Sequence, residues 1–132
     1  MKKEMVDSEK LVERKLVEVV KSIGGMCIKL LSQHTLGLPD RLCLLPGARI
    51  AFVELKTTGQ KPKKIQLFMH DKIRKLGFRV EVIDTIEKVY KFLAKKAPQA
   101  WKKIYYGAQK GVLSKVSNST NILMAKKLNK LF

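Results

Sequence analysis

The chain has 132 residues, which is enough for one domain with an ordinary hydrophobic core. No apolar stretch is long enough to span a membrane and the N-terminus lacks the apolar region of a signal peptide, so we expect neither a membrane-spanning nor a secreted protein. The formal net charge of +17 exceeds the roughly 8 charges that suffice for the solubility of a small domain, which indicates a polyanionic partner.

The positive charge is concentrated towards the C-terminus. Residues 1–87 hold 17 basic and all 11 acidic residues, whereas residues 88–132 hold 11 basic residues and no acid. Nucleic acid and an anionic membrane are both polyanions, but no lipidation motif accompanies the charge. The two cysteines, Cys27 and Cys43, lie in apolar runs typical of reduced core thiols, so we expect a cytoplasmic protein.

The first predicted element is a helix over residues 9–23, with Ser8 as its N-cap. Glu9 and Glu13 lie one turn apart at the edge of its apolar stripe, from where a carboxylate can reach the end of a sheet. An ordinary role on the solvated surface is equally compatible with both glutamates. The stripe itself consists of Leu11, Val12, Leu16, Val19, Val20 and Ile23.

A strand over residues 26–31 and a β-hairpin follow. The hairpin has apolar runs at 42–45 and 50–53, joined by a turn at 46–48. In a hairpin with this three-residue turn, Asp40 lies opposite Glu54, with Cβ atoms about 5 Å apart. Because side chains alternate along a strand, Glu54 and Lys56 share one face.

Two carboxylates at this distance repel each other unless a cation lies between them. A divalent metal ion would resolve this repulsion. An isolated E-x-K sequence is most often a solvated ion pair, so the prediction depends on its combination with G-x-P-D at 37–40.

The polar loop over residues 57–64 is basic, and its Lys61, Lys63 and Lys64 suit a phosphodiester backbone. A helix over residues 63–76 follows, with Gln66 near its start. Its expected core stripe is Ile65, Phe68, Met69, Ile73 and Leu76.

The remaining elements are a strand over 79–83 and a helix over 85–95. A helix connects the strand over 79–83 to the preceding strand, so the two should be parallel. The order αβββαβα predicts an α/β domain with a central mixed sheet flanked by helices, over residues 1–96. Residues 97–132 predict a basic C-terminal extension, whose amphipathic helix over 121–132 could pack on its own domain, a second subunit or a membrane.

The combined pattern Gly37-x-Pro39-Asp40-Arg41-Leu42, Phe52-Val53-Glu54-Leu55-Lys56 and Gln66 resembles the phage-type VRR-NUC branch of the PD-(D/E)xK nuclease superfamily. The resemblance covers about residues 8–93. It implies a restriction-endonuclease-like core and an Mg²⁺- or Mn²⁺-dependent DNA endonuclease. It further implies branched DNA as substrate (a Holliday junction, flap or nick), a homodimer and, for a phage protein, the host cytoplasm.

The resemblance also implies roles for individual residues. Asp40, Glu54, Lys56 and Gln66 would be catalytic. The metal ligands would be Asp40, Glu54, the carbonyl of Leu55 and one helical glutamate. Glu9 resembles the first glutamate of phage VRR-NUC sequences and Glu13 the spacing in archaeal junction resolvases, with Glu13 slightly preferred. Arg41, Lys61, Lys63 and Lys64 would bind DNA.

Two other classes of protein are compatible with the charge. A non-catalytic, basic nucleic-acid-binding protein would explain the +17 and the extension. A membrane-surface protein would explain the amphipathic helix. Both leave the pairing of Asp40 with Glu54 beside Lys56 without a purpose, so the nuclease is preferred.

Overall fold

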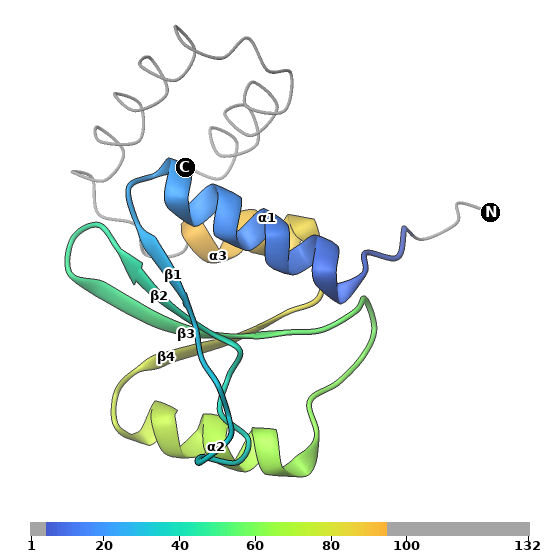
Figure 1. The fold of residues 1–132 in the computed structure, drawn as a ribbon, viewed down its shortest axis with the longest axis vertical. Coiled ribbons are helices and arrows are strands. Elements are labelled where there is room, and N and C mark those ends of the chain that lie inside the picture. Colours follow the sequence, from blue (N-terminus) through green and yellow to red (C-terminus); the bar gives the residue numbers. More distant parts are fainter. Residues whose placement is uncertain (1–4, 95–132) are drawn as a thin grey trace, which may run out of the picture.

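The computed structural model describes residues 5–94, which contain three helices and four strands (Figure 1). The extension predicted for residues 97–132 lies outside the described residues. The order αβββαβα is confirmed. In sequence, the elements are α1 (Glu9–Ser22), β1 (Met26–Lys29), β2 (Arg41–Leu45), β3 (Arg49–Leu55), α2 (Lys64–Lys75), β4 (Arg79–Ile83) and α3 (Ile86–Ala94).

The four strands form one mixed sheet in the order β1-β2-β3-β4. The pairs β1–β2 and β2–β3 are antiparallel, and β3–β4 is parallel as predicted. Figure 1 shows α1 and α3 together on one face of the sheet and α2 on the other. No helix within residues 5–94 is long and apolar enough to cross a membrane.

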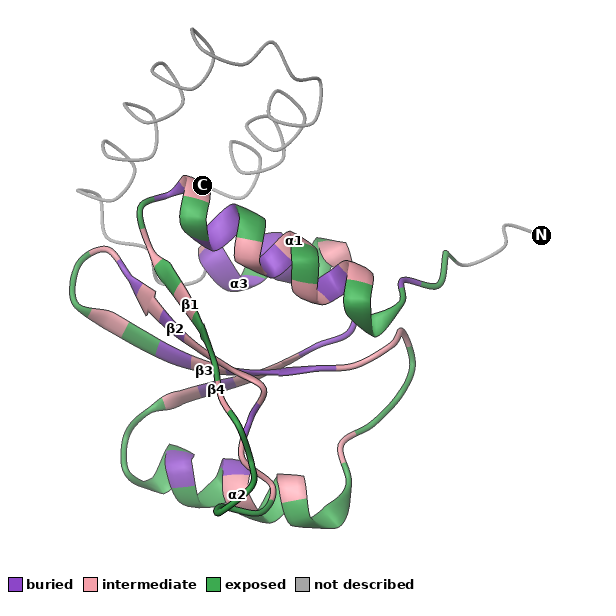
Figure 2. Cartoon of the chain, in the orientation of Figure 1, coloured by how far each residue is buried: buried purple, intermediate pink, exposed green. Residues whose placement is uncertain are grey.

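The core lies between the sheet and the α1–α3 pair. Alternate residues of β3 point into it, because successive side chains of a strand face opposite sides. Figure 2 shows buried residues in α1, α3 and β3. The core residues are Val12, Leu16, Val19, Val20, Ile23, Cys43, Leu45, Ala51, Val53, Leu55, Ile83, Val89, Tyr90, Phe92 and Leu93.

The core stripe predicted for α2 is confirmed only in part: Ile73 is buried and Met69 half-buried, but Ile65, Phe68 and Leu76 are exposed. Phe68 and Leu76 are 61% and 76% exposed, and the buried residues of this helix are His70 and Ile73. Apolar periodicity assumes that the apolar side of a helix faces the sheet. Here His70 contacts Glu54, a buried charged residue of β3 that an apolar side chain could not satisfy. Most of the helix is exposed, as Figure 2 shows.

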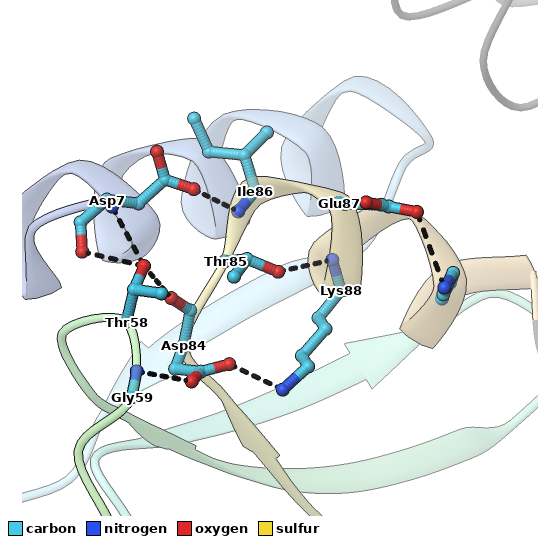
Figure 3. A network of polar contacts seen from close by, with 9 residues as sticks. Asp7, Thr58, Gly59, Asp84, Thr85, Ile86, Glu87 and Lys88 are labelled. Atoms are coloured by element: carbon cyan, nitrogen blue, oxygen red, sulfur yellow. Dashed lines mark hydrogen bonds and ion pairs between the residues drawn. The ribbon is translucent and has the colours of Figure 1, made fainter. Parts of the chain in front are cut away.

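A polar network connects the segment before α1 to the loop after β3 and to the start of α3 (Figure 3). The backbone N–H of Asp7 donates to Thr58 Oγ1 (2.8 Å), and that hydroxyl donates to the carbonyl of Asp84 (2.8 Å). Asp84 Oδ2 accepts from the N–H of Gly59 (2.8 Å), and Asp7 Oδ2 accepts from the N–H of Ile86 (2.9 Å). The network therefore fixes the N-terminal end of α1 beside the loop that follows the E-x-K sequence.

Candidate active site

The hairpin has the predicted register. Leu45 pairs with Arg49 and Arg41 with Val53, which places Asp40 opposite Glu54 at the next step. Asp40 is fixed on both sides: its carbonyl accepts from the N–H of Leu30 (2.9 Å), and its Oδ2 accepts from the N–H of Leu55 (2.7 Å). The Asp40 carboxylate is therefore held at the end of β3 by backbone groups.

Glu54 is the buried member of this pair. It lies on β3 facing α2 and is 1% exposed. Burial, together with hydrogen bonding and repulsion from Asp40, raises its pKa to about 8. The ammonium of Lys56 is 3.7 Å from Glu54 Oε2 and opposes this rise only in part. The protein alone therefore leaves the two carboxyl groups short of positive charge.

Gly37, the first residue of the G-x-P-D sequence, makes a close backbone contact with α2. Its φ is +76°, and a Cβ at this position would lie 2.4 Å from the carbonyl oxygen of Ile65. Only glycine combines this left-handed conformation with so close an approach. This contact packs the loop before Asp40 against the first turn of α2.

Gln66 lies in the same turn of α2. Its Oε1 accepts from the backbone N–H of Lys63 (2.8 Å), so in this structure it stabilises the start of the helix. The lysines predicted to bind DNA, Lys61, Lys63 and Lys64, are all exposed on the loop that leads into α2 and at its first residue.

Both helical glutamates border one hollow of about 250 Å³. Asp40 and Leu55 form its wall at the sheet, and the remaining lining residues are Glu9, Lys10, Glu13, Lys29 and Leu30. The hollow therefore contains four of the five positions expected to hold a metal. Glu54, the fifth, is adjacent in sequence to Leu55 and faces the other side of the sheet.

The two glutamates have different partners. Glu13 Oε2 is 3.3 Å from the Nε of Arg41, whose other nitrogen donates to the carbonyl of Cys27 (3.3 Å). Burial and Asp40 are the main causes that raise the pKa of Glu54, and the negative charge of Glu9 adds a smaller contribution in the same direction. Arg41, expected to bind DNA, is thus half-buried and paired with Glu13.

No family model matches the chain. A protein named "Putative nuclease p44" from Acyrthosiphon pisum secondary endosymbiont phage 1 is 43% identical over 77 residues, which are 58% of this chain and 83% of that protein. A solved structure of a VRR_NUC domain is 31% identical, covers 69% of this chain and all of its own, and superposes with a TM-score of 0.63. The chain belongs to the VRR-NUC family.

Within this VRR-NUC fold, residues 5–94 contain no group of three or more histidine, cysteine, aspartate and glutamate side chains arranged as a ready-made metal site. The donors present are nevertheless suitable for one. Asp40 and Glu54 are adjacent carboxyl groups that need positive charge, and two further carboxylates border the hollow beside them. Carboxylate oxygens are the hard ligands that Mg²⁺ and Mn²⁺ prefer.

Three residues near the site were not foreseen from the sequence. Lys10 and Lys29 line the hollow, and His70 lies against Glu54, with its Nε2 3.3 Å from Glu54 Oε1. Lys10 follows Glu9 directly, and His70 is one helical turn after Gln66. The positions of Lys10 relative to Glu9 and of His70 relative to Gln66 could have suggested these residues from the sequence. Both spacings are common in helices that have no such site.

Proposed function

We propose that this VRR-NUC domain is a divalent-metal-dependent DNA endonuclease. The observation that carries the proposal is the pairing of Asp40 with a buried Glu54 at the end of β3, beside the ammonium of Lys56. The nuclease relative, the fold and the excess of basic residues support it.

Asp40, Glu54 and the backbone carbonyl of Leu55 would hold Mg²⁺ or Mn²⁺, together with one glutamate of α1. Glu9 is the better candidate for this glutamate, because Glu13 already has Arg41 as its partner. A bound divalent cation lowers the pKa of water and neutralises charge that develops on a phosphate.

The other residues bind and orient the substrate. Lys56, held 3.7 Å from Glu54, would orient the attacking water or stabilise negative charge on the scissile phosphate. Lys61, Lys63 and Lys64, with Lys10 and Lys29 at the hollow, would contact the DNA backbone. Gln66, by capping α2, would keep the loop before Asp40 in place.

We further propose branched DNA as the substrate, with a homodimer as the active form. Resolving a four-way junction requires two symmetric cuts, which a two-fold dimer supplies. We place the protein in the cytoplasm, that of the host if a phage encodes the chain. The burial of Cys43 and half-burial of Cys27 support this, because both are typical of core cysteines.

The test is cleavage of a synthetic four-way junction, a flap and a plain duplex in Mg²⁺, Mn²⁺ or EDTA. Asp40→Asn and Glu54→Gln should each reduce the wild-type rate to about 1% or less, because each removes a charged metal ligand. DNA binding, measured by fluorescence anisotropy, should be unchanged or slightly tighter, because negative charge near the phosphates is removed.

Cleavage by the wild type in EDTA, or full activity in either variant, would contradict the metal site. Binding of DNA without cleavage under every metal condition would instead show a non-catalytic DNA-binding protein. Equal rates on the junction, the flap and the plain duplex would contradict only the proposed preference for branched DNA.

A further inference from the structure

His70 is the buried residue of α2 that the proposed chemistry does not use. Its side chain is fully buried, although most of α2 is exposed and its large apolar residues Ile65, Leu67 and Phe68 are 46–61% exposed. A helix that buries a histidine while exposing such residues has the reverse of the usual arrangement. Packing alone does not explain it.

The hydrogen bonding of His70 is one-sided. Nε2 is 3.3 Å from Glu54 Oε1, whereas Nδ1 is buried and has no partner among the described residues. The imidazole is fully buried and lies near the positive charges of Arg74 and Lys56, surroundings that disfavour a second proton on the ring. A Glu54 carboxylate that binds a cation is ionised and can only accept, so in that state the contact requires the proton of the ring on Nε2. Leaving Nδ1 unpaired is unfavourable, so the contact of Nε2 with Glu54 is the polar interaction that favours this buried position.

We propose that His70 is a positioning residue for Glu54: its Nε2–H fixes Oε1 and thereby directs Oε2 towards the metal side of the carboxyl group. The distances agree with this assignment, because Oε1 is near His70 and Oε2 is 3.7 Å from the ammonium of Lys56. A neutral donor is suited to the task, since it orients a carboxylate without neutralising the charge that a cation requires. The inference rests on the proposed metal-dependent function.

The experiment compares His70→Gln with His70→Met. The two side chains are of similar length and both suit a helix, but only glutamine can donate an N–H to Glu54. Binding of Mn²⁺ without DNA is measured by calorimetry, and kcat and KM are measured on the DNA substrate. Ile73→Ala is the matched control, because it removes the other buried side chain of α2 without touching a polar contact.

We expect His70→Met to weaken Mn²⁺ binding about 10–100-fold and to lower kcat, because losses of this size follow when a group that orients a metal ligand is removed. KM for DNA should remain within about twofold, since phosphate contacts are made by other residues. His70→Gln should bind Mn²⁺ nearly as well as the wild type. Ile73→Ala should lower the melting temperature while leaving the affinity for Mn²⁺ unchanged.

Wild-type affinity for Mn²⁺ in His70→Met, or equal losses in the Gln and Met variants, would overturn the inference. An equal loss in Ile73→Ala would do the same, because it would show that packing of α2 matters and the hydrogen bond does not. If His70→Met does not fold, His70→Asn replaces it, since its shorter amide should not reach Glu54 and should lose affinity where Gln keeps it; equal affinities would then refute the proposal. A wild type that neither binds Mn²⁺ nor cleaves DNA would refute the proposed function itself.

Discussion

Glu9 and Glu13 illustrate how two identical side chains one helical turn apart acquire different roles. Both border the same hollow. The Arg41 guanidinium is 3.3 Å from Glu13, while Glu9 contributes to the field at Glu54. A carboxylate already paired with arginine is less available to a cation, because the cation must replace that partner. Glu9 is therefore the better candidate for the proposed metal ligand.

We therefore expect Glu9→Gln to lower kcat at least about 100-fold under saturating Mg²⁺, since it removes a charged ligand. Glu13→Gln should lower it less than about tenfold, because this glutamate acts through Arg41. The measurement is single-turnover cleavage of the junction by both variants, with thermal melting to confirm that each is folded. The reverse order of effects would assign the ligand to Glu13, and normal rates in both would show that α1 supplies no ligand.

At the residue scale, the sequence was sufficient to predict the pairing of Asp40 with Glu54. The length of the turn fixes the register of a hairpin, and Leu45 pairs with Arg49 across the expected three-residue turn. The sequence could not choose between Glu9 and Glu13. That choice depends on where Arg41 points, and its partners come from α1 and β1, which are remote in sequence.

At the element scale, order and connectivity were predictable, because apolar periodicity, caps and the crossover rule all act locally. The orientation of α2 was not. It depends on the contact of His70 with Glu54 and on the bond from Arg74 to the carbonyl of Val80 (2.8 Å), both of which cross between elements. Its exposed apolar residues then leave part of this side of the molecule uncovered.

The network around Asp84 joins elements that are distant in sequence, and it should make stability depend on pH. Burial tends to raise the pKa of Asp84, but the ion pair with Lys88 (2.6 Å) and the N–H of Gly59 outweigh burial and lower it below 3.8. A carboxyl group with a lowered pKa stabilises the folded state above its ordinary pKa. The contribution is therefore complete above pH 3.8 and is lost as the pH falls through the lowered value.

We expect Asp84→Asn to destabilise the domain by about 1 kcal/mol at pH 7, because a charged hydrogen bond is replaced by a neutral one. This corresponds to a decrease in melting temperature of about 5 °C. The difference from the wild type should shrink as the pH is lowered towards 3. Glu87→Gln is the control, since its ion pair with Lys91 is largely exposed and should contribute little. A pH-independent difference would show that Asp84 acts through shape alone.

At the scale of the whole molecule, the basic residues divide into two groups. One surrounds the candidate site, at Lys10, Lys29, Lys56 and the loop over 61–64. The other belongs to residues 88–132, which have a net charge of +11. Because the core of the described domain uses residues 12–93, removal of residues 98–132 should leave that core and the carboxylates intact. Truncation can therefore test whether residues 98–132 contribute to the proposed DNA binding without altering the candidate site.

Truncation after Ala97 removes seven lysines, and we expect it to weaken DNA binding in a way that depends on salt. Removing one lysine–phosphate interaction should reduce the slope of log K against log salt by about 0.9, and only a few of the seven lysines can reach one duplex at once. Cleavage at saturating DNA and low salt should survive if the extension only binds DNA.

The control is a variant that keeps residues 98–132 but has the same seven lysines changed to glutamine. It removes the positive charge without removing the residues, so it should reproduce the smaller slope while keeping any subunit contact. If the stripe over 122–132 instead packs between subunits, the truncated protein alone should sediment as a monomer and make single nicks in place of paired cuts. An unchanged slope in both variants, with intact dimers, would contradict both roles for this extension.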